Sequence, residues 1–247
     1  MSMRASFLGW IIGSLMSLVS LGAQAGENVL DRIQLLRSES FRACASILLS
    51  YDPYARTFDR AETDSYQSSL EKMAEVVSSP DLAGVKEEYS SFSSSIKALE
   101  SSTQDASVFS VNDVLVAQAR LIAAADKLYS WYFSDGNTVK RKLHELSLEK
   151  SKLLVIYQAR PYGGVVNYPG VLLDENTLPS MDALITSDLE VLRKSIPESA
   201  LELDDIQRSY AFVRPRILDV RKKFVADGVK YYLGRNIDRL DAIASKL

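Results

Sequence analysis

The sequence predicts an all-α protein, an up-down helical bundle organised as two tandem four-helix-bundle-like repeats. Apolar residues recur at spacings of three and four over nearly the whole chain, which is typical of helices packed at about 20°. Strand-like alternation of apolar and polar residues is sustained nowhere. Only 11 glycines and 7 prolines interrupt 247 residues, which favours long helices.

The first 25 residues have the composition of an export signal. Arg4 supplies a positive charge, residues 5–21 are mostly apolar, and Ala23 and Ala25 are the small residues that a signal peptidase requires. We therefore expect a signal peptide over residues 1–25, cleaved after Ala25, and a periplasmic mature protein. The alternative is an uncleaved membrane anchor, because the apolar stretch approaches the roughly 18 residues that span a bilayer.

Helix boundaries in the mature chain are marked by proline, glycine and capping residues. Asp52-Pro53 ends the first helix, Pro80 breaks the second, and Gly136 suits the end of a later one, with Asn137 or Thr138 capping the helix that follows. The apolar stripes between these boundaries are Leu82, Val85, Tyr89, Phe92, Ile96 and Leu99, then Val114, Leu121, Ala125, Leu128 and Tyr132, then Val139, Leu143, Leu146, Leu153 and Tyr157.

The two halves of the mature chain resemble each other. The first of these stripes recurs at a constant offset of 121 residues, as Leu203, Ile206, Tyr210, Val213, Ile217 and Val220. The first helix of each half also ends in Pro-Tyr, at Pro53-Tyr54 and Pro161-Tyr162. We interpret this as a duplication, with a first repeat over 26–105 and a second over 106–247 that includes a connecting helix and a long loop at 158–179.

The loop at 158–179 departs from the helical pattern. It contains three glycines and three prolines, and it is too apolar for a solvated linker. We expect it to fold back as a cap on one end of the bundle; the alternative is a lid over a ligand.

Catalytic and metal chemistry have little support in the composition. His144 is the only histidine and Cys44 the only cysteine, whereas zinc and transition-metal sites need several such ligands. Hydrolase and phosphate-loop motifs are absent, and a net charge of −3 gives no reason to expect nucleic acid. We therefore expect no enzyme activity and no cofactor, with His144 on a helix surface and Cys44 buried in a core.

One face of the first mature helix is unusual for a helix that only packs. Arg37, Ser40, Phe41 and Cys44 are spaced at i, i+3, i+4 and i+7 and therefore share a face. Arginine is the side chain best suited to hold a planar anion through forked hydrogen bonds. The alternative is a surface arginine whose stem covers apolar neighbours.

The run Leu36-Arg37-Ser38-Glu39-Ser40-Phe41-Arg42 resembles a family motif. It is similar to the Leu-Arg-x-x-Ser-aromatic-Arg motif of periplasmic nitrate and nitrite sensor domains, and to an Arg-x-x-Ser-x-Arg run in the sensor domain of type IV pilus methyl-accepting chemotaxis transducers. The resemblance implies tandem four-helix bundles in which Arg37 binds a small anion such as nitrate or nitrite at the two-fold interface of a homodimer. Ser40 and Arg42 would support that anion.

Three departures from the family pattern qualify this expectation. Glu39 places a negative charge beside the arginines, and the second half has Leu143 and Leu146 at the positions of Arg37 and Ser40. No second membrane-spanning stretch or signalling domain follows, so we expect a membrane receptor or envelope protein to carry any signal.

The expected function is thus an exported ligand- or partner-binding sensor-like module in pilus- or nitrate-linked signalling. The alternative is a structural or interaction protein of the cell envelope without a small-molecule ligand.

Overall fold

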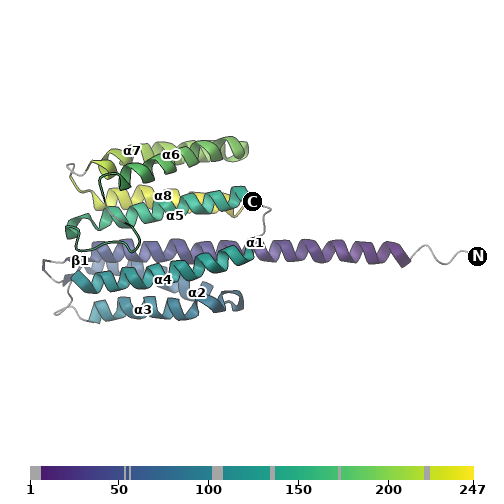
Figure 1. The fold of residues 1–247 in the computed structure, drawn as a ribbon, viewed down its shortest axis with the longest axis horizontal. Helices are drawn as coiled ribbons and strands as arrows, with labels where there is room; N and C mark the ends of the chain where they lie inside the picture. Colours follow the sequence, from purple (N-terminus) through teal and green to yellow (C-terminus); the bar gives the residue numbers. More distant parts are fainter. Residues whose placement is uncertain are drawn as a thin grey trace, which may run out of the picture.

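The computed structural model describes residues 7–52, 54–55, 57–101, 108–133, 137–171, 174–219 and 223–247. Its elements form the all-α fold that the sequence predicts, and the helices run nearly side by side (Figure 1). The helices are α1 (Phe7–Ser50), α2 (Arg60–Val77), α3 (Lys86–Ser101), α4 (Val108–Tyr132), α5 (Thr138–Gln158), α6 (Thr177–Ser195), α7 (Ala200–Leu218) and α8 (Ala226–Ala244).

Short elements connect these helices. The 3-10 turns are η1 (Pro80–Val85), η2 (Arg160–Tyr162) and η3 (Pro197–Ser199). The two-residue strands β1 (Tyr51–Asp52) and β2 (Thr57–Phe58) pair antiparallel. Asn137 is the N-cap of α5, and its side chain accepts a hydrogen bond from the backbone N–H of Lys140 at 3.0 Å.

Helix α1 is one continuous helix of 44 residues whose N-terminal half projects beyond the bundles (Figure 1). The expected cleavage position after Ala25 falls within its helical backbone. Residues 1–6, and the side chains up to residue 28, lie outside the described residues, so the export signal stays a prediction. Within the described part of the chain, none of the helices is both long enough and apolar enough to cross a membrane.

The helices form two groups of four. In the first, α1 packs against α2 and α4, and α3 packs against α4; in the second, α5 and α7 each pack against α6 and α8. The expected division at residue 105 does not follow this packing, because α4 buries Val111, Val114 and Leu121 within the first group. The division falls instead at the connection between α4 and α5.

The two bundles meet along α1, which packs against both α5 and α8. Helix α5 is therefore covered by α1 on one side and by α6 and α8 on the others, and it buries polar as well as apolar side chains. Because α5 is central, its polar side chains are buried at the junction of the two bundles.

The loop at 158–179 folds back onto the first bundle, burying Tyr162, Val166 and Tyr168. The Tyr162 hydroxyl donates to the carbonyls of Leu48 at 2.9 Å and Tyr51 at 2.8 Å, at the C-terminal end of α1. Helix ends leave such carbonyls without partners in the helix, so Tyr162 stabilises this end.

Candidate functional site

Arg37 lies inside the first bundle, where its side chain is 8% exposed. Its Nη2 is 2.6 Å from Oδ1 of Asp126 on α4, and its guanidinium lies 4.7 Å from the centre of the Tyr129 ring. Burial lowers the pKa of Arg37, and the carboxylate of Asp126 opposes that effect. An external anion at Arg37 would have to displace a carboxylate that is already paired.

Ser40 is fully buried on the same side of α1. Its hydroxyl donates to the carbonyl of Arg37 at 2.8 Å and accepts from Nε2 of Gln118 at 3.1 Å. Gln118 in turn accepts from the Tyr168 hydroxyl at 2.9 Å. Ser40 is thus part of a network that joins α1, α4 and the long loop.

Arg42 points to a different side of α1, toward α8, because five residues correspond to a rotation of about 140° around a helix. Its guanidinium pairs with Asp238 of α8, and its Nε lies 3.7 Å from Oε1 of Glu39. The structure therefore brings Arg37 and Ser40 together against α4 and places Arg42 elsewhere. The three residues do not share one site.

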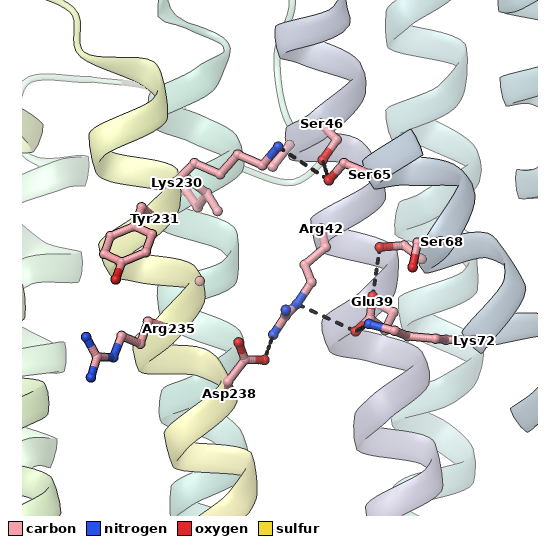
Figure 2. Close-up of a pocket in the computed structure, with 14 residues that line it drawn as sticks. Glu39, Arg42, Ser46, Ser65, Ser68, Lys72, Lys230, Tyr231, Arg235 and Asp238 are labelled. Carbon is pink, nitrogen blue, oxygen red and sulfur yellow. Dashed lines mark hydrogen bonds and ion pairs between the residues drawn. The ribbon is translucent and has the colours of Figure 1, made fainter. Parts of the chain in front are cut away.

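Arg42 lines a cleft of about 500 Å³ at the junction of the two bundles (Figure 2). One wall comes from α1 and α2, the other from α8, and Leu154 of α5 contributes to the lining between them. The lining residues are Glu39, Arg42, Ala45, Ser46, Ser65, Ser68, Ser69, Lys72, Leu154, Lys230, Tyr231, Gly234, Arg235 and Asp238.

Positive charge predominates in this cleft. Four cationic side chains line it, against two carboxylates. Glu39 is almost fully buried; it accepts a hydrogen bond from Ser69 at 2.7 Å and one from Lys72 at 3.2 Å. Asp238 is 60% exposed and pairs with Arg42. Both carboxylates are thus matched by cations of α1 and α2.

Helix α8 adds two further positive charges to the cleft, Lys230 and Arg235. Lys230 reaches across to the hydroxyl of Ser65 at 3.4 Å, and Ser65 shares a hydrogen bond of 3.0 Å with Ser46. Arg235 is exposed beside Tyr231 and makes no ion pair within the described residues (Figure 2). Each wall of the cleft thus carries two cations and one carboxylate, because α8 also contributes Asp238.

A second polar cluster lies at the same junction, nearer the start of α5. His144 is 1% exposed, which corrects the expectation of a surface histidine. Its Nδ1 is 2.9 Å from the Tyr129 hydroxyl, and Lys140 donates to Asp31 at 3.1 Å. Burial, with Arg37 and Lys140 nearby, lowers the pKa of His144 to about 3, so the ring is neutral at ordinary pH.

Cys44 is fully buried, as expected, and burial raises the pKa of its thiol. In the described part of the chain, no group of three or more histidine, cysteine or acidic side chains is arranged to hold a metal ion.

The sequence indicates Arg42 and Glu39 but none of the other residues that line the cleft. Lys72 is on α2, and Lys230 and Arg235 are on α8, about 190 residues from Arg42 along the chain. No local motif links them, because only the packing of α8 on α1 brings them together.

No family model matches the chain, and neither a curated protein nor a solved structure matches it significantly.

Proposed function

We propose that the protein is an exported helical binding module that takes an anionic ligand in the cleft between its two bundles. The observation that carries this proposal is the excess of cationic side chains in that cleft, four against two carboxylates, in a chain whose net charge is −3. A concave site lined by one sign of charge attracts the opposite one and raises its local concentration.

The two walls of the cleft belong to different bundles, which is what a sensor-like action requires. Arg42 and Lys72 belong to the first bundle, and Lys230 and Arg235 to the second, so a ligand held by both walls contacts both bundles. Differential contacts of this kind shift the equilibrium between arrangements of the bundles. A membrane receptor or envelope protein that binds one arrangement would then carry the signal, in keeping with the resemblance to pilus and nitrate sensor domains.

In this proposal Arg37 stabilises the fold and does not contact the ligand. Its pairing with Asp126 and its stacking near Tyr129 hold α4 against α1. Arg42, the second arginine of the motif, takes the place nearest the ligand. Small oxyanions such as nitrate and nitrite belong to the candidate ligands of the cleft.

Isothermal titration calorimetry with nitrate, nitrite, phosphate and acetate tests the proposal. We expect at least one of these anions to bind, and Arg235→Gln to weaken that binding about tenfold, since a charge-assisted hydrogen bond is worth about 1.5–3 kcal/mol. Arg208→Gln is the matched control, because Arg208 is exposed on α7 and pairs with Asp205 outside the cleft. No binding by any anion, or equal binding by both variants, contradicts the proposal.

A further inference from the structure

Three aromatic side chains form one continuous patch on the exposed surface of α7 and α8. The ring centre of Phe212 on α7 lies 5.0 Å from that of Tyr232 on α8, and the ring centre of Tyr232 lies 5.2 Å from that of Tyr231. Phe212 is 68% exposed and Tyr231 is 60% exposed. Isolated exposed apolar residues are ordinary, whereas contiguous ones are typical of surfaces that bind a partner.

The core beneath this aromatic patch holds its rings in place. Tyr232 is half-buried and packs against the hydrophobic core, and its ring contacts the two exposed rings. Val213 and Leu233, which follow two of these rings in the sequence, are buried. A partner that packs on the patch therefore orders few side chains, which lowers the entropic cost of binding.

An exposed arginine flanks the aromatic patch on each helix. Arg216 follows Phe212 by four residues on α7 and so shares a helix face with it. Arg235 stands in the same relation to Tyr231 on α8, and Figure 2 shows both side chains extending from α8 away from Arg42. Within the described residues, neither Arg216 nor Arg235 makes an ion pair.

The acidic residues near the patch do not cancel these charges. Asp205 already pairs with Arg208 on α7, so that pair adds no net charge. Asp227 on α8 is exposed, and it is one carboxylate against both Arg216 and Arg235. The surroundings of the aromatic patch are thus positive on balance.

The two bundles also differ in net charge. Residues 137–247 contain 18 lysines and arginines against 15 acidic residues, whereas residues 26–133 contain 10 against 16. The aromatic patch therefore lies on the cationic bundle of a chain whose net charge is −3. A cationic surface steers acidic partners toward itself and repels basic ones.

We propose that this face of α7 and α8 binds an acidic segment of another protein. An aromatic or aliphatic side chain of that segment packs on Phe212 and Tyr231, and its carboxylates pair with Arg216 and Arg235. Phenylalanine, tyrosine and arginine are the residue types enriched in the cores and hot spots of protein–protein interfaces. A guanidinium also matches the planar carboxylate through forked hydrogen bonds.

The charges argue against two other occupants of this face. A second copy of the chain docked through the same face would bring arginine against arginine, which is repulsive. Anionic lipid surfaces are recognised by clusters of about four to eight lysines and arginines. In the described part of the chain, only Arg216 and Arg235 flank the patch without an acidic partner.

Selection of peptides from a random phage library on the immobilised protein tests the proposal. The recovered peptides should carry aspartate or glutamate beside an aromatic or aliphatic residue. Fluorescence anisotropy with labelled synthetic copies of these peptides then measures affinity. Phe212→Ser should weaken binding about tenfold and Arg216→Gln about fivefold, as expected for contacts at the centre and edge of an interface.

Matched controls come from the first bundle. Phe109 on α4 is 69% exposed, and Arg120 on the same helix is exposed without an ion pair in the described structure. Phe109→Ser and Arg120→Gln should bind the peptides as the unchanged protein does. Circular dichroism of all four variants checks that the fold is kept.

The outcomes distinguish the possible occupants. Recovery of no peptides, of peptides without an acidic excess, or of peptides that bind Phe212→Ser and Phe109→Ser equally overturns the proposal. Self-association in sedimentation that Phe212→Ser abolishes would assign the face to a second copy. Binding to phosphatidylglycerol vesicles that Phe212→Ser abolishes, without peptide binding, would assign it to lipid. Either result overturns the acidic protein segment.

This inference goes beyond the anion site and can fail separately from it. Phe212 and Arg216 do not line the cleft, so their variants should leave anion binding in the cleft unchanged. Loss of peptide binding with unchanged anion binding supports the docking face, and the reverse result leaves the anion site standing alone.

Discussion

At the scale of single residues, several ionisable side chains are buried by contacts with residues far away in the sequence, and the local spacing of residues along one helix does not reveal such contacts. Arg37 and His144 show this most plainly. The partner of Arg37 is Asp126, 89 residues away, so the sequence indicates a polar face without indicating that the face is already paired. His144 is buried because α5 is surrounded by α1, α6 and α8, and even positions off its apolar stripe are covered.

Lys150 is the most exceptional of these buried residues. It is 0% exposed, and its Nζ lies 4.0 Å from the centre of the Tyr210 ring without a hydrogen bond in the described structure. Burial lowers its pKa to about 7, and Asp182 opposes that effect. The neighbouring Asp182 is occupied by Tyr210 and by Arg214, at 2.9 and 2.6 Å.

The substitution Lys150→Met should raise the free energy of unfolding at pH 6.5 by about 1–4 kcal/mol, because a buried charge is replaced by an apolar chain of similar size. The folded pKa is depressed, so the unfolded state binds the extra proton between about pH 7 and 10, and the stability of the unchanged protein rises over that window. The gain should therefore be smaller at pH 9.5. Chemical denaturation at both pH values measures it, with the exposed Lys97→Met as control. A gain that is equal at both pH values contradicts this account.

At the scale of elements, the sequence predicts the helices well because each one carries its own period and its own end signals. The Pro80 break becomes η1, the Asn137 cap begins α5, and Pro197 begins η3 at the corresponding place in the second half. How the elements meet is less predictable, since contacts between helices depend on side chains far apart in sequence. The contact of α1 with α8 is an example.

Asp241 on α8 illustrates that contact. It accepts hydrogen bonds from Ser38 at 2.8 Å and Gln34 at 3.0 Å, both on α1, and burial raises its pKa to about 6. The folded state therefore binds more protons than the unfolded state between about pH 4 and 6, so this group makes stability fall as the pH rises through that window.

Asp241→Asn should accordingly raise the melting temperature at pH 7, by an amount equivalent to about 1–2 kcal/mol, and the difference should vanish near pH 4. Thermal unfolding followed by circular dichroism from pH 4 to 7 measures this. Asp205→Asn, at a half-exposed position outside the junction, serves as a control for the change of residue type. A variant less stable than the unchanged protein at pH 7 would show that the charge of Asp241 stabilises the junction.

The long loop makes a separate prediction at this scale. Tyr162→Phe removes the hydroxyl that donates to Leu48 and Tyr51, and it should lower the free energy of unfolding by about 1–2 kcal/mol, since buried carbonyls lose their partner. Denaturation in urea measures the loss. Tyr54→Phe is the matched control, because Tyr54 is 88% exposed, and it should have no effect. Equal stability of the two variants would show that the loop does not stabilise the end of α1.

At the scale of the whole molecule, the cleft exists only because two bundles are joined along α1. The sequence predicts two repeats, and the structure has two groups of four helices, but the cleft has one wall, with Lys230, Arg235 and Asp238, that belongs to α8. No repeat pattern or motif in the first bundle indicates this wall. The site is therefore a property of tertiary packing, and its chemistry differs from that expected at Arg37.

The most direct test of the anion site is nuclear magnetic resonance of the arginine Nε–H groups during titration with nitrate and with phosphate. The account predicts that the resonances of Arg42 and Arg235 shift on binding, whereas that of Arg37 stays in place because Asp126 holds it. Assignment by single Arg→Lys variants identifies each signal. A shift of Arg37 alone, with Arg42 and Arg235 unchanged, would contradict the account and return the site to the interior of the first bundle.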